Sequence, residues 1–245
     1  MKKLYDIIRQ LSKIRFLYSL YINLKLLPFK KAIRLPIFIY PRTIFKNTGR
    51  VVFIDDDLSL GCIKVGAPEL SFHQRKIYSH IINKGELYLG KNVEIKAGIC
   101  CAITPSGRLY FENDAKTGAN VKIVCCKEIK IQHNTRIGYE SQLVDANFHY
   151  IETLGNEEFG NIAKPIIIGS WSWIASKVTI NAGTILPNNT IVGSNSFLNK
   201  DYTGTVPENS LLAGSPAKLL KTGVRRVWDK DKENELIKRE GIIWT

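Results

Sequence analysis

An aliphatic residue stands at every sixth position through much of the C-terminal half of this chain. A period of six fits neither the 3.6-residue repeat of a helix nor the two-residue repeat of an isolated strand. It fits a solenoid in which each hexapeptide forms a short strand and a turn, so that three hexapeptides make one triangular turn of about eighteen residues. The stacked interior is predicted to consist of Ile168, Ile174, Ile180, Leu186, Val192 and Leu198 and, after a two-residue insertion, of Val206 and Leu212.

The same rhythm continues upstream in a less regular form. Residues 85–89 resemble residues 107–111, which lie twenty-two positions later, or one eighteen-residue turn plus four. Small or turn-forming residues follow the aliphatic positions, as sharp corners require. The upstream aliphatic positions are Leu89, Ile95, Ile131, Ile137 and Leu143, and the clearest corner residues are Gly169, Ala175, Asn181, Pro187, Gly193 and Asn199.

These patterns predict a mainly β protein built around one solenoid. The 245 residues and 44% hydrophobic content suffice for one sizeable core with appendages. We expect a parallel β-helix over residues 51–221, preceded by a basic segment at 1–50 and followed by a helical cap at 222–245. The rhythm stops over residues 150–164, which predicts a protruding loop of the kind that often carries function.

Residues 1–50 hold twelve Lys and Arg residues against Asp6 alone, and they account for most of the net charge of +13. Their apolar residues recur at steps of three and four, which predicts a cationic amphipathic helix over residues 3–27. Such a helix can lie on an anionic membrane surface, or it can pack on the rest of the protein or on a neighbouring subunit. No nucleic-acid-binding motif accompanies the charge, so no nucleic-acid partner is expected. The apolar positions are Leu4, Ile7, Ile8, Leu11, Ile14, Tyr18, Tyr21 and Leu24.

No run of about eighteen apolar residues and no secretory leader is present, which predicts a cytoplasmic protein, at most peripheral to the inner face of the membrane. The five cysteines are Cys62 and the adjacent pairs at 100–101 and 125–126. An odd number without CxxC spacing fits neither a disulfide framework nor a structural zinc site. We expect all five to be small core residues.

Several hexapeptides carry a more specific pattern. The residues are Ile168-Gly169, Trp173-Ile174-Ala175, Val178-Thr179-Ile180, Gly183, Ile191-Val192-Gly193, Ser196, Lys200-Asp201 and Ala213-Gly214-Ser215-Pro216-Ala217-Lys218. In these positions the chain resembles the hexapeptide-repeat acyltransferases of the maltose, galactoside and capsular-polysaccharide O-acetyltransferase group. The resemblance implies a left-handed parallel β-helix, a homotrimer with active sites between neighbouring prisms, and acetyl-CoA as the acyl donor without a metal.

Transfer of an acetyl group from a thioester to a sugar hydroxyl needs a general base, because the hydroxyl does not ionise near neutral pH. We predict His149, which stands where the six-residue series breaks and the loop begins. Residues 145–149, Asp-Ala-Asn-Phe-His, are similar to the family segment that ends in the catalytic histidine. Asp145 or Asn147 is expected to orient its ring, although an aspartate there also suits a turn. The remaining histidines are His73, His80 and His133.

The acyl donor is expected along a column of small residues. With turns of eighteen and then twenty residues, Ala175, Gly193 and Ala213 fall on one corner, where an extended pantetheine arm can approach the backbone. Small residues also make good corners without any ligand, and Trp173 can equally pack between subunits. Basic residues are needed near the phosphates of coenzyme A. The resemblance and the column together give the predicted cofactor-binding set Trp173, Ala175, Ser176, Gly193, Ser194, Asn199, Lys200, Ala213, Lys218 and Arg225, with Lys221 as a further cation and Ser176 also as an oxyanion donor.

The predicted function is therefore acetyl-CoA-dependent O-acetylation of a sugar hydroxyl in the synthesis of a bacterial surface polysaccharide, with a sugar acceptor that can be lipid-linked. Transfer to the amine of an amino sugar is the main alternative, because the same base and donor site serve both reactions. A non-catalytic solenoid scaffold is a second alternative. A zinc enzyme of the carbonic anhydrase type is disfavoured, since the histidines lack the paired spacing that three convergent ligands need.

Overall fold

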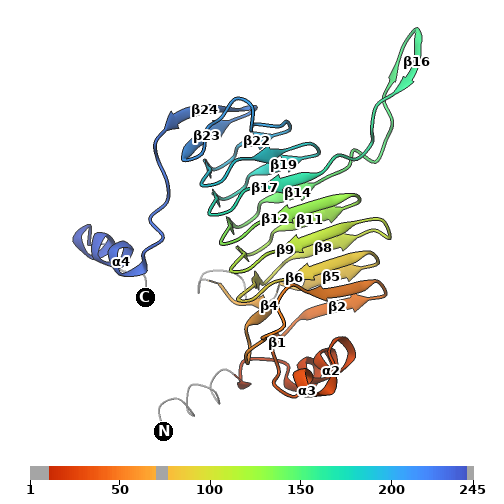
Figure 1. Cartoon of the computed structure of the whole chain (residues 1–245), viewed down its shortest axis with the longest axis vertical. Coiled ribbons are helices and arrows are strands. Elements are labelled where there is room, and N and C mark those ends of the chain that lie inside the picture. Colours follow the sequence, from red (N-terminus) through yellow and green to blue (C-terminus); the bar gives the residue numbers. More distant parts are fainter. Residues whose placement is uncertain (1–10, 70–76, 242–245) are drawn as a thin grey trace.

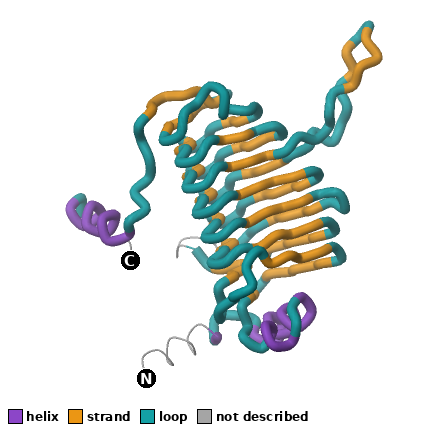
Figure 2. Tube along the Cα trace, viewed as in Figure 1, coloured by secondary structure: helices purple, strands orange, loops and turns teal. Residues whose placement is uncertain are grey.

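The computed structural model describes residues 11–69 and 77–241, and most of them wind into a triangular prism (Figure 1). Along the chain the strands enter three sheets in the repeating order A, B, C, and Figure 2 shows the resulting stack of strands and turns. The strands in each sheet are parallel, except at the C-terminal end. The fold is the left-handed parallel β-helix that the resemblance implies.

Among the described residues each sheet forms one face of the prism. Sheet A contains β1 (Ile37–Ile39), β4 (Ile63–Ala67), β7 (Glu94–Lys96), β10 (Lys116–Thr117), β13 (Arg136–Ile137), β18 (Trp173–Ile174), β21 (Ile191–Val192), β23 (Ser210–Gly214) and β24 (Ala217–Thr222). Sheet B contains β2 (Thr43–Asn47), β5 (Ser79–Asn83), β8 (Cys100–Ile103), β11 (Lys122–Cys125), β14 (Gln142–Val144), β19 (Thr179–Asn181) and β22 (Phe197–Leu198). Sheet C contains β3 (Arg50–Phe53), β6 (Glu86–Leu89), β9 (Arg108–Phe111), β12 (Glu128–Ile131), β17 (Ile166–Ile168) and β20 (Ile185–Leu186).

The sixth-position aliphatic residues fill the interior, as predicted. In sheet A, Ile137, Ile174, Val192 and Leu212 stack in register and are buried. The upstream rhythm is looser because the turns are longer there. One turn takes 22 residues between β8 and β11 and 20 between β11 and β14, but 18 between β19 and β22. The hexapeptide pattern is thus clearest where the turn length equals three repeats.

The outward positions differ between the three faces. Sheets A and C carry ladders of ion pairs. On sheet A, Glu94 pairs with Lys96 at 2.7 Å and with Lys116 at 3.5 Å. Burial alone would raise the pKa of the Glu94 carboxyl, but the hydrogen bond and charge of Lys96, with the charge of Lys116, outweigh it and leave the pKa below its ordinary value. Sheet C pairs Arg108 with Glu128 at 3.2 Å.

The prism begins earlier than predicted. Its parallel ladder starts at β1, which pairs with β4, rather than near Val51. Helix α2 (Phe16–Leu26) and the short α3 (Phe29–Ala32) cover this end. The expected continuous helix over 3–27 is interrupted: residues 12–15 form a turn and a bend, and residues 3–10 lie outside the described part.

Helix α2 covers the edge strand β1 with polar side chains as well as apolar ones. The Ser19 hydroxyl accepts the Ile39 N–H at 2.9 Å, and the Asn23 amide exchanges hydrogen bonds with the N–H and C=O of Ile37. An edge strand would otherwise present unpaired backbone groups. The amphipathic pattern in the sequence did not predict which face of α2 is buried, because the polar Ser19 and Asn23 are buried while Tyr21 is exposed.

The C-terminal helix does not cap the prism, in contrast to the prediction. The last turn ends in β24, which folds back antiparallel on β23. The chain then runs down the outside of the prism to α4 (Lys230–Arg239), none of whose residues is buried. Trp228, just before α4, lies 5.6 Å from Trp171 and 5.4 Å from the guanidinium of Arg136, which holds the segment against the prism wall.

The cysteines are free, and three are core residues as expected: Cys62, Cys101 and Cys125. The other two are not, because Cys100 points outward from sheet B and Cys126 is only half-buried. Within residues 11–69 and 77–241, no helix has the length and apolar character needed to cross a membrane.

Candidate active site

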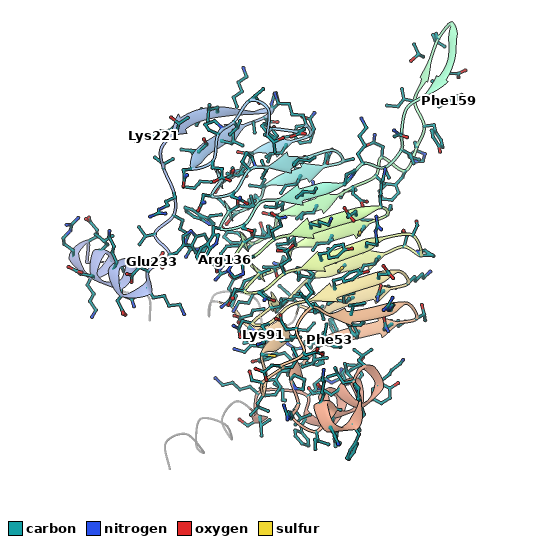
Figure 3. The ribbon with its side chains drawn as sticks, in the orientation of Figure 1. Phe53, Lys91, Arg136, Phe159, Lys221 and Glu233 are labelled. Atoms are coloured by element: carbon teal, nitrogen blue, oxygen red, sulfur yellow. The ribbon has the colours of Figure 1, made fainter. Side chains whose placement is uncertain are left out.

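The predicted loop leaves the prism between sheets B and C. Strand β14 ends at Val144 and the prism resumes at Ile166. The two strands of the loop's stem are joined by hydrogen bonds from Asn147 N to Ile162 O at 2.9 Å and from Lys164 N to the Asp145 carbonyl at 3.0 Å. Beyond the stem, β15 (Glu152–Thr153) and β16 (Asn156–Phe159) form a hairpin that projects away from the prism (Figure 3). We use the name B/C edge for the edge of the prism at which the chain turns from sheet B into sheet C, as it does after Val144.

His149 lies at the base of this hairpin and is exposed. Among the described residues, its imidazole has no hydrogen-bonding partner. The preceding Phe148 has a φ of 61°, a left-handed conformation that is rare for a bulky side chain and is often found next to functional residues. His149 is therefore presented to whatever occupies the B/C edge, with neither nitrogen committed within the described chain. His73 lies outside the described residues.

Asp145 is fully buried and serves the adjacent turn of the prism. Its carboxylate accepts the backbone N–H groups of Cys126 at 2.6 Å, Lys127 at 2.8 Å and Glu128 at 2.8 Å. Within the part of the chain that the structure describes, no hydrogen bond joins it to His149. Of the two roles open from the sequence, these three hydrogen bonds favour the turn. Among the described residues, the exposed Asn147 takes part in the stem through its backbone N–H.

An open hollow of about 450 Å³ lies at the base of the loop. Burial raises the pKa of the Cys126 thiol on its wall, and the Asp145 carboxylate raises it further, so this thiol stays protonated near neutral pH. No sequence pattern indicated the upstream residues in this wall, because they reach it only through the stacking of turns. The hollow is lined by Ser106, Cys126, Lys127, Ala146, Phe148, Ile162 and Ala163.

The predicted column of small residues lies on a different edge. Ala175, Gly193 and Ala213 each follow a strand of sheet A or stand near its end, at the corner that leads to sheet B. We call this corner the A/B edge. Gly138 occupies the same edge one turn earlier, and a Cβ there would come within 2.5 Å of the Ala175 backbone. The small size of Gly138 is thus a packing requirement against backbone, and at Gly193 an added Cβ would also come too close, at 2.9 Å from the Ala213 methyl.

Free backbone donors accompany this column. The N–H groups of Ala175 and Gly193 donate hydrogen bonds within the parallel ladder, to the carbonyl oxygens of Val192 at 2.9 Å and of Leu212 at 2.8 Å. The following residues, Ser176 and Ser194, have N–H groups with no acceptor among the described residues. They repeat eighteen positions apart along the edge. The A/B edge therefore offers two donors, one turn apart, to an extended ligand that carries amide carbonyls, as a pantetheine arm does.

The remaining predicted cofactor residues do not form one cluster. Lys218 is exposed and pairs with Ala213 in the β23–β24 ladder, so a cation stands at the end of the small-residue column. Asn199 and Lys200 are exposed after β22, on the B/C edge instead. Exposed Arg225 follows β24, in the segment that leads to α4.

Trp173 points outward from sheet A and is exposed. The guanidinium of Arg226, from the segment that leads to α4, lies 5.6 Å from the Trp173 ring and 4.8 Å from the Trp228 ring. Burial lowers the pKa of Arg136 beside them, and the charge of Arg226 lowers it further. In this chain Trp173 is thus part of the contact that holds the C-terminal segment, which neither of its two predicted roles included.

Among residues 11–69 and 77–241, no group of three or more His, Cys, Asp or Glu side chains is arranged to hold a metal ion.

Comparison with known proteins identifies relatives of the same architecture, although no protein-family model matches the chain. A lipopolysaccharide-biosynthesis O-acetyltransferase of Escherichia coli K12 is 26% identical over 161 residues, which cover 62% of this chain and 80% of that protein. A polysialic acid O-acetyltransferase of E. coli O1:K1 is 29% identical over 148 residues, covering 60% of this chain but 46% of that protein.

Among solved structures, a polysialic acid O-acetyltransferase shares the fold, with a TM-score of 0.58 at 22% sequence identity over 83% of this chain and 94% of that chain. These findings agree with the resemblance carried by the hexapeptides: the chain is similar in sequence to acyltransferases of the hexapeptide-repeat class and shares their fold. More narrowly, its relatives include acetyltransferases whose names refer to lipopolysaccharide, to colanic acid and to polysialic acid, and two of these names specify O-acetyl transfer.

Proposed function

We propose that the protein is an acetyl-CoA-dependent O-acetyltransferase that acts on a sugar hydroxyl of a surface polysaccharide or its precursor. The observation that carries this proposal is a free imidazole, His149, at the mouth of a loop on a prism that also bears the donor-lined A/B edge. The named substrates of the relatives support a saccharide acceptor.

The proposed reaction needs one proton shuttle. The acyl donor supplies a thioester that is already activated. The neutral imidazole of His149 takes the proton from the acceptor hydroxyl as its oxygen bonds to the acetyl carbon, and then returns that proton to the sulfur as the carbon–sulfur bond breaks. The products are an acetyl ester and a free thiol. The N–H groups of Ser176 and Ser194 are suited to hold the arm of the donor, and Lys218 to contact its phosphates.

A single chain does not bring these groups together. His149 belongs to the B/C edge, and the column from Ala175 to Ala213 belongs to the A/B edge, so the full width of sheet B separates them. When three copies turn the same face toward a threefold axis, the B/C edge of each meets the A/B edge of the next. A homotrimer packed through sheet B therefore completes three sites.

The outward surface of sheet B suits this assembly. Over its described strands it includes two lysines and no acidic residue, and it lacks the ion-pair ladders of the other two faces. One register column across its centre is apolar and half-exposed, which favours burial against another copy. That column runs through Ile82, Ala102, Val124 and Val144.

We further propose a cytoplasmic location at the inner face of the membrane, where a lipid-linked saccharide is accessible. The basic character of residues 1–50 supports this location. It is independent of the acetyl-transfer chemistry and is tested separately.

The catalytic proposal is tested by release of free thiol from acetyl-CoA in the presence of saccharide acceptors. Wild type should turn over and His149→Ala should lose at least about a hundredfold of kcat, because general-base catalysis contributes that much or more. Ser176→Pro and Ser194→Pro should each raise the KM for acetyl-CoA about fivefold, since each removes one N–H donor that the ladder does not use. Ser194→Ala, which keeps the N–H, is the matched control and should not. Undiminished turnover by His149→Ala contradicts the mechanism.

The shared site is tested by mixing chains. Co-expressed His149→Ala and Ser176→Pro/Ser194→Pro chains, assayed at low acetyl-CoA concentration, should recover roughly a quarter of wild-type activity, because one interface in four joins an intact loop to an intact edge. Were both halves of the site on one chain, the mixture would show no recovery.

A further inference from the structure

The N-terminal cap has a second apolar face, which is exposed apart from the half-buried Leu20. Helix α2 directs Ile22 and Leu26 into the end of the prism, where both contact the interior. Successive residues of a helix are about 100° apart around its axis. By this spacing, the residues on the opposite side of α2 form a continuous stripe that is directed away from the prism, along the axis of the prism. The stripe is Phe16, Leu17, Leu20, Tyr21 and Leu24, and α3 adds Phe29 beside it.

This outer face is strongly apolar for a surface. Leu17 is 79% exposed and Phe29 is 69% exposed. Soluble monomers seldom expose contiguous apolar patches of this kind, and those that occur mark interaction sites. Because Ser19, Ile22 and Asn23 already secure α2 to the prism, the stripe is not needed to hold the helix in place.

The charges around the stripe identify the chemistry of its partner. Exposed cations flank the stripe, and residues 11–50 contain no acidic residue. Asp56, which lies close to α3, is engaged with Lys31 at 2.6 Å. Apolar side chains ringed by cations match the boundary between acyl chains and anionic headgroups. The flanking cations are Lys13, Lys25, Lys30 and Arg34.

We propose that the outer face of α2 and α3 docks on an anionic lipid bilayer, so that the prism stands end-on with its axis along the membrane normal. In the trimer of the proposed function, on which this step rests, all three caps lie at the same end of the threefold axis. Three weak contacts then act together, and binding becomes much tighter than one cap provides.

This orientation sets the height of the active site above the lipid. Four ladder steps separate β2 from β14 in sheet B. At about 4.8 Å each these steps span about 19 Å, and the cap helix adds about 10 Å. The base of the loop at His149 therefore stands about 30 Å from the bilayer, with the hairpin directed away from it. The acceptor unit must be several sugars removed from a lipid carrier.

The docking is tested by flotation of the full-length protein with vesicles, without acetyl-CoA or acceptor, so the outcome does not depend on catalysis. Wild type should float with phosphatidylcholine vesicles that contain about 30% phosphatidylglycerol, and much less with phosphatidylcholine alone. Leu17→Glu/Leu24→Glu should bind at least about tenfold more weakly, because two inserted leucines are lost. The matched control is Leu219→Glu/Leu220→Glu at the opposite end of the prism, which should bind like wild type.

Four results would overturn the proposal: no flotation of wild type, equal binding to both vesicle types, undiminished binding by the α2 variant, or equal loss in the β24 control. Thermal stability, the oligomeric state and thiol release with a soluble acceptor should be unchanged in the α2 variant. A change in its oligomeric state would instead assign the stripe to a second copy of the chain and also overturn docking on lipid.

Discussion

Replacement of Asp145 by asparagine separates a role in holding the prism from a role in catalysis. The side chain keeps its shape but loses its charge and one of its two acceptor oxygens. At best the remaining oxygen keeps the N–H groups of Lys127 and Glu128, which share Oδ2, and leaves the N–H of Cys126 without an acceptor. The turn at 126–128 is therefore expected to be weakened in every rotamer of the amide.

The cost follows from the three hydrogen bonds. One buried N–H without an acceptor costs about 1–3 kcal/mol, and the loss of charge from the other two bonds adds about 1–2 kcal/mol. A destabilisation of about 2–5 kcal/mol should lower Tm by roughly 5–15 °C in a chain of this size. Circular dichroism melting at fixed protein concentration measures it, since assembly makes Tm depend on concentration. Asp201→Asn, at an exposed carboxylate that accepts only from Thr203, is the control and should melt like wild type.

The outcome distinguishes the two roles. If Asp145 holds the turn, Tm falls, and thiol release by the remaining folded enzyme retains the pH profile of wild type. If it orients the imidazole, kcat falls by about a hundredfold or more while Tm is unchanged. The latter result would refute the structural role that the hydrogen bonds of Asp145 indicate.

Three further predictions concern packing, charge and assembly. Gly138→Ala should destabilise the prism by about 1–3 kcal/mol in urea unfolding, because its methyl meets backbone, whereas Gly160→Ala in open space should not. Glu94→Gln should lower Tm at pH 7, and the difference from wild type should shrink as the pH falls below the ordinary carboxyl pKa and disappear once the pH is below the lower folded-state pKa, because a depressed folded-state pKa stabilises fully only above the ordinary carboxyl pKa. Val124→Lys on sheet B should give monomers and no thiol release in sedimentation and activity assays, while Val52→Lys on sheet C should leave both unchanged.

The interior could be predicted from the sequence because the same physical requirement recurs at each hexapeptide. One inward side chain per face has to be aliphatic, and one corner residue has to be small, so Ile168 to Leu198 identify the fold by repetition. The prediction of His149 rests on the same rhythm. The six-residue series is interrupted before the prism resumes at Ile166, and His149 stands where the interruption begins. Longer turns upstream blur the period, which explains why the pattern does not reveal the start at Ile37.

Other features depend on contacts that no local pattern records. Ser19 and Asn23 look like ordinary surface residues of a helix, but they face the unpaired backbone of β1, which lies fourteen or more positions away. The hydrogen bonds of Asp145 reach back seventeen to nineteen residues. In both cases a polar side chain satisfies backbone groups of another turn, and only the stacking of turns reveals which ones.

The geometry of the prism relates the position of the site to the need for several copies. A triangular solenoid has no concave surface of its own, because its interior is filled and its faces are flat. A loop can provide a hollow at one edge, as at Ser106 and Phe148, but the opposite wall has to come from elsewhere. In a threefold assembly the neighbour's A/B edge, with the donors of Ser176 and Ser194, supplies that wall, and the packing of the prism interior is not interrupted. A chain with these faces is therefore expected to be catalytic only when sheet B is buried against its copies, and dilution below the trimer dissociation constant should abolish thiol release even though each prism remains folded.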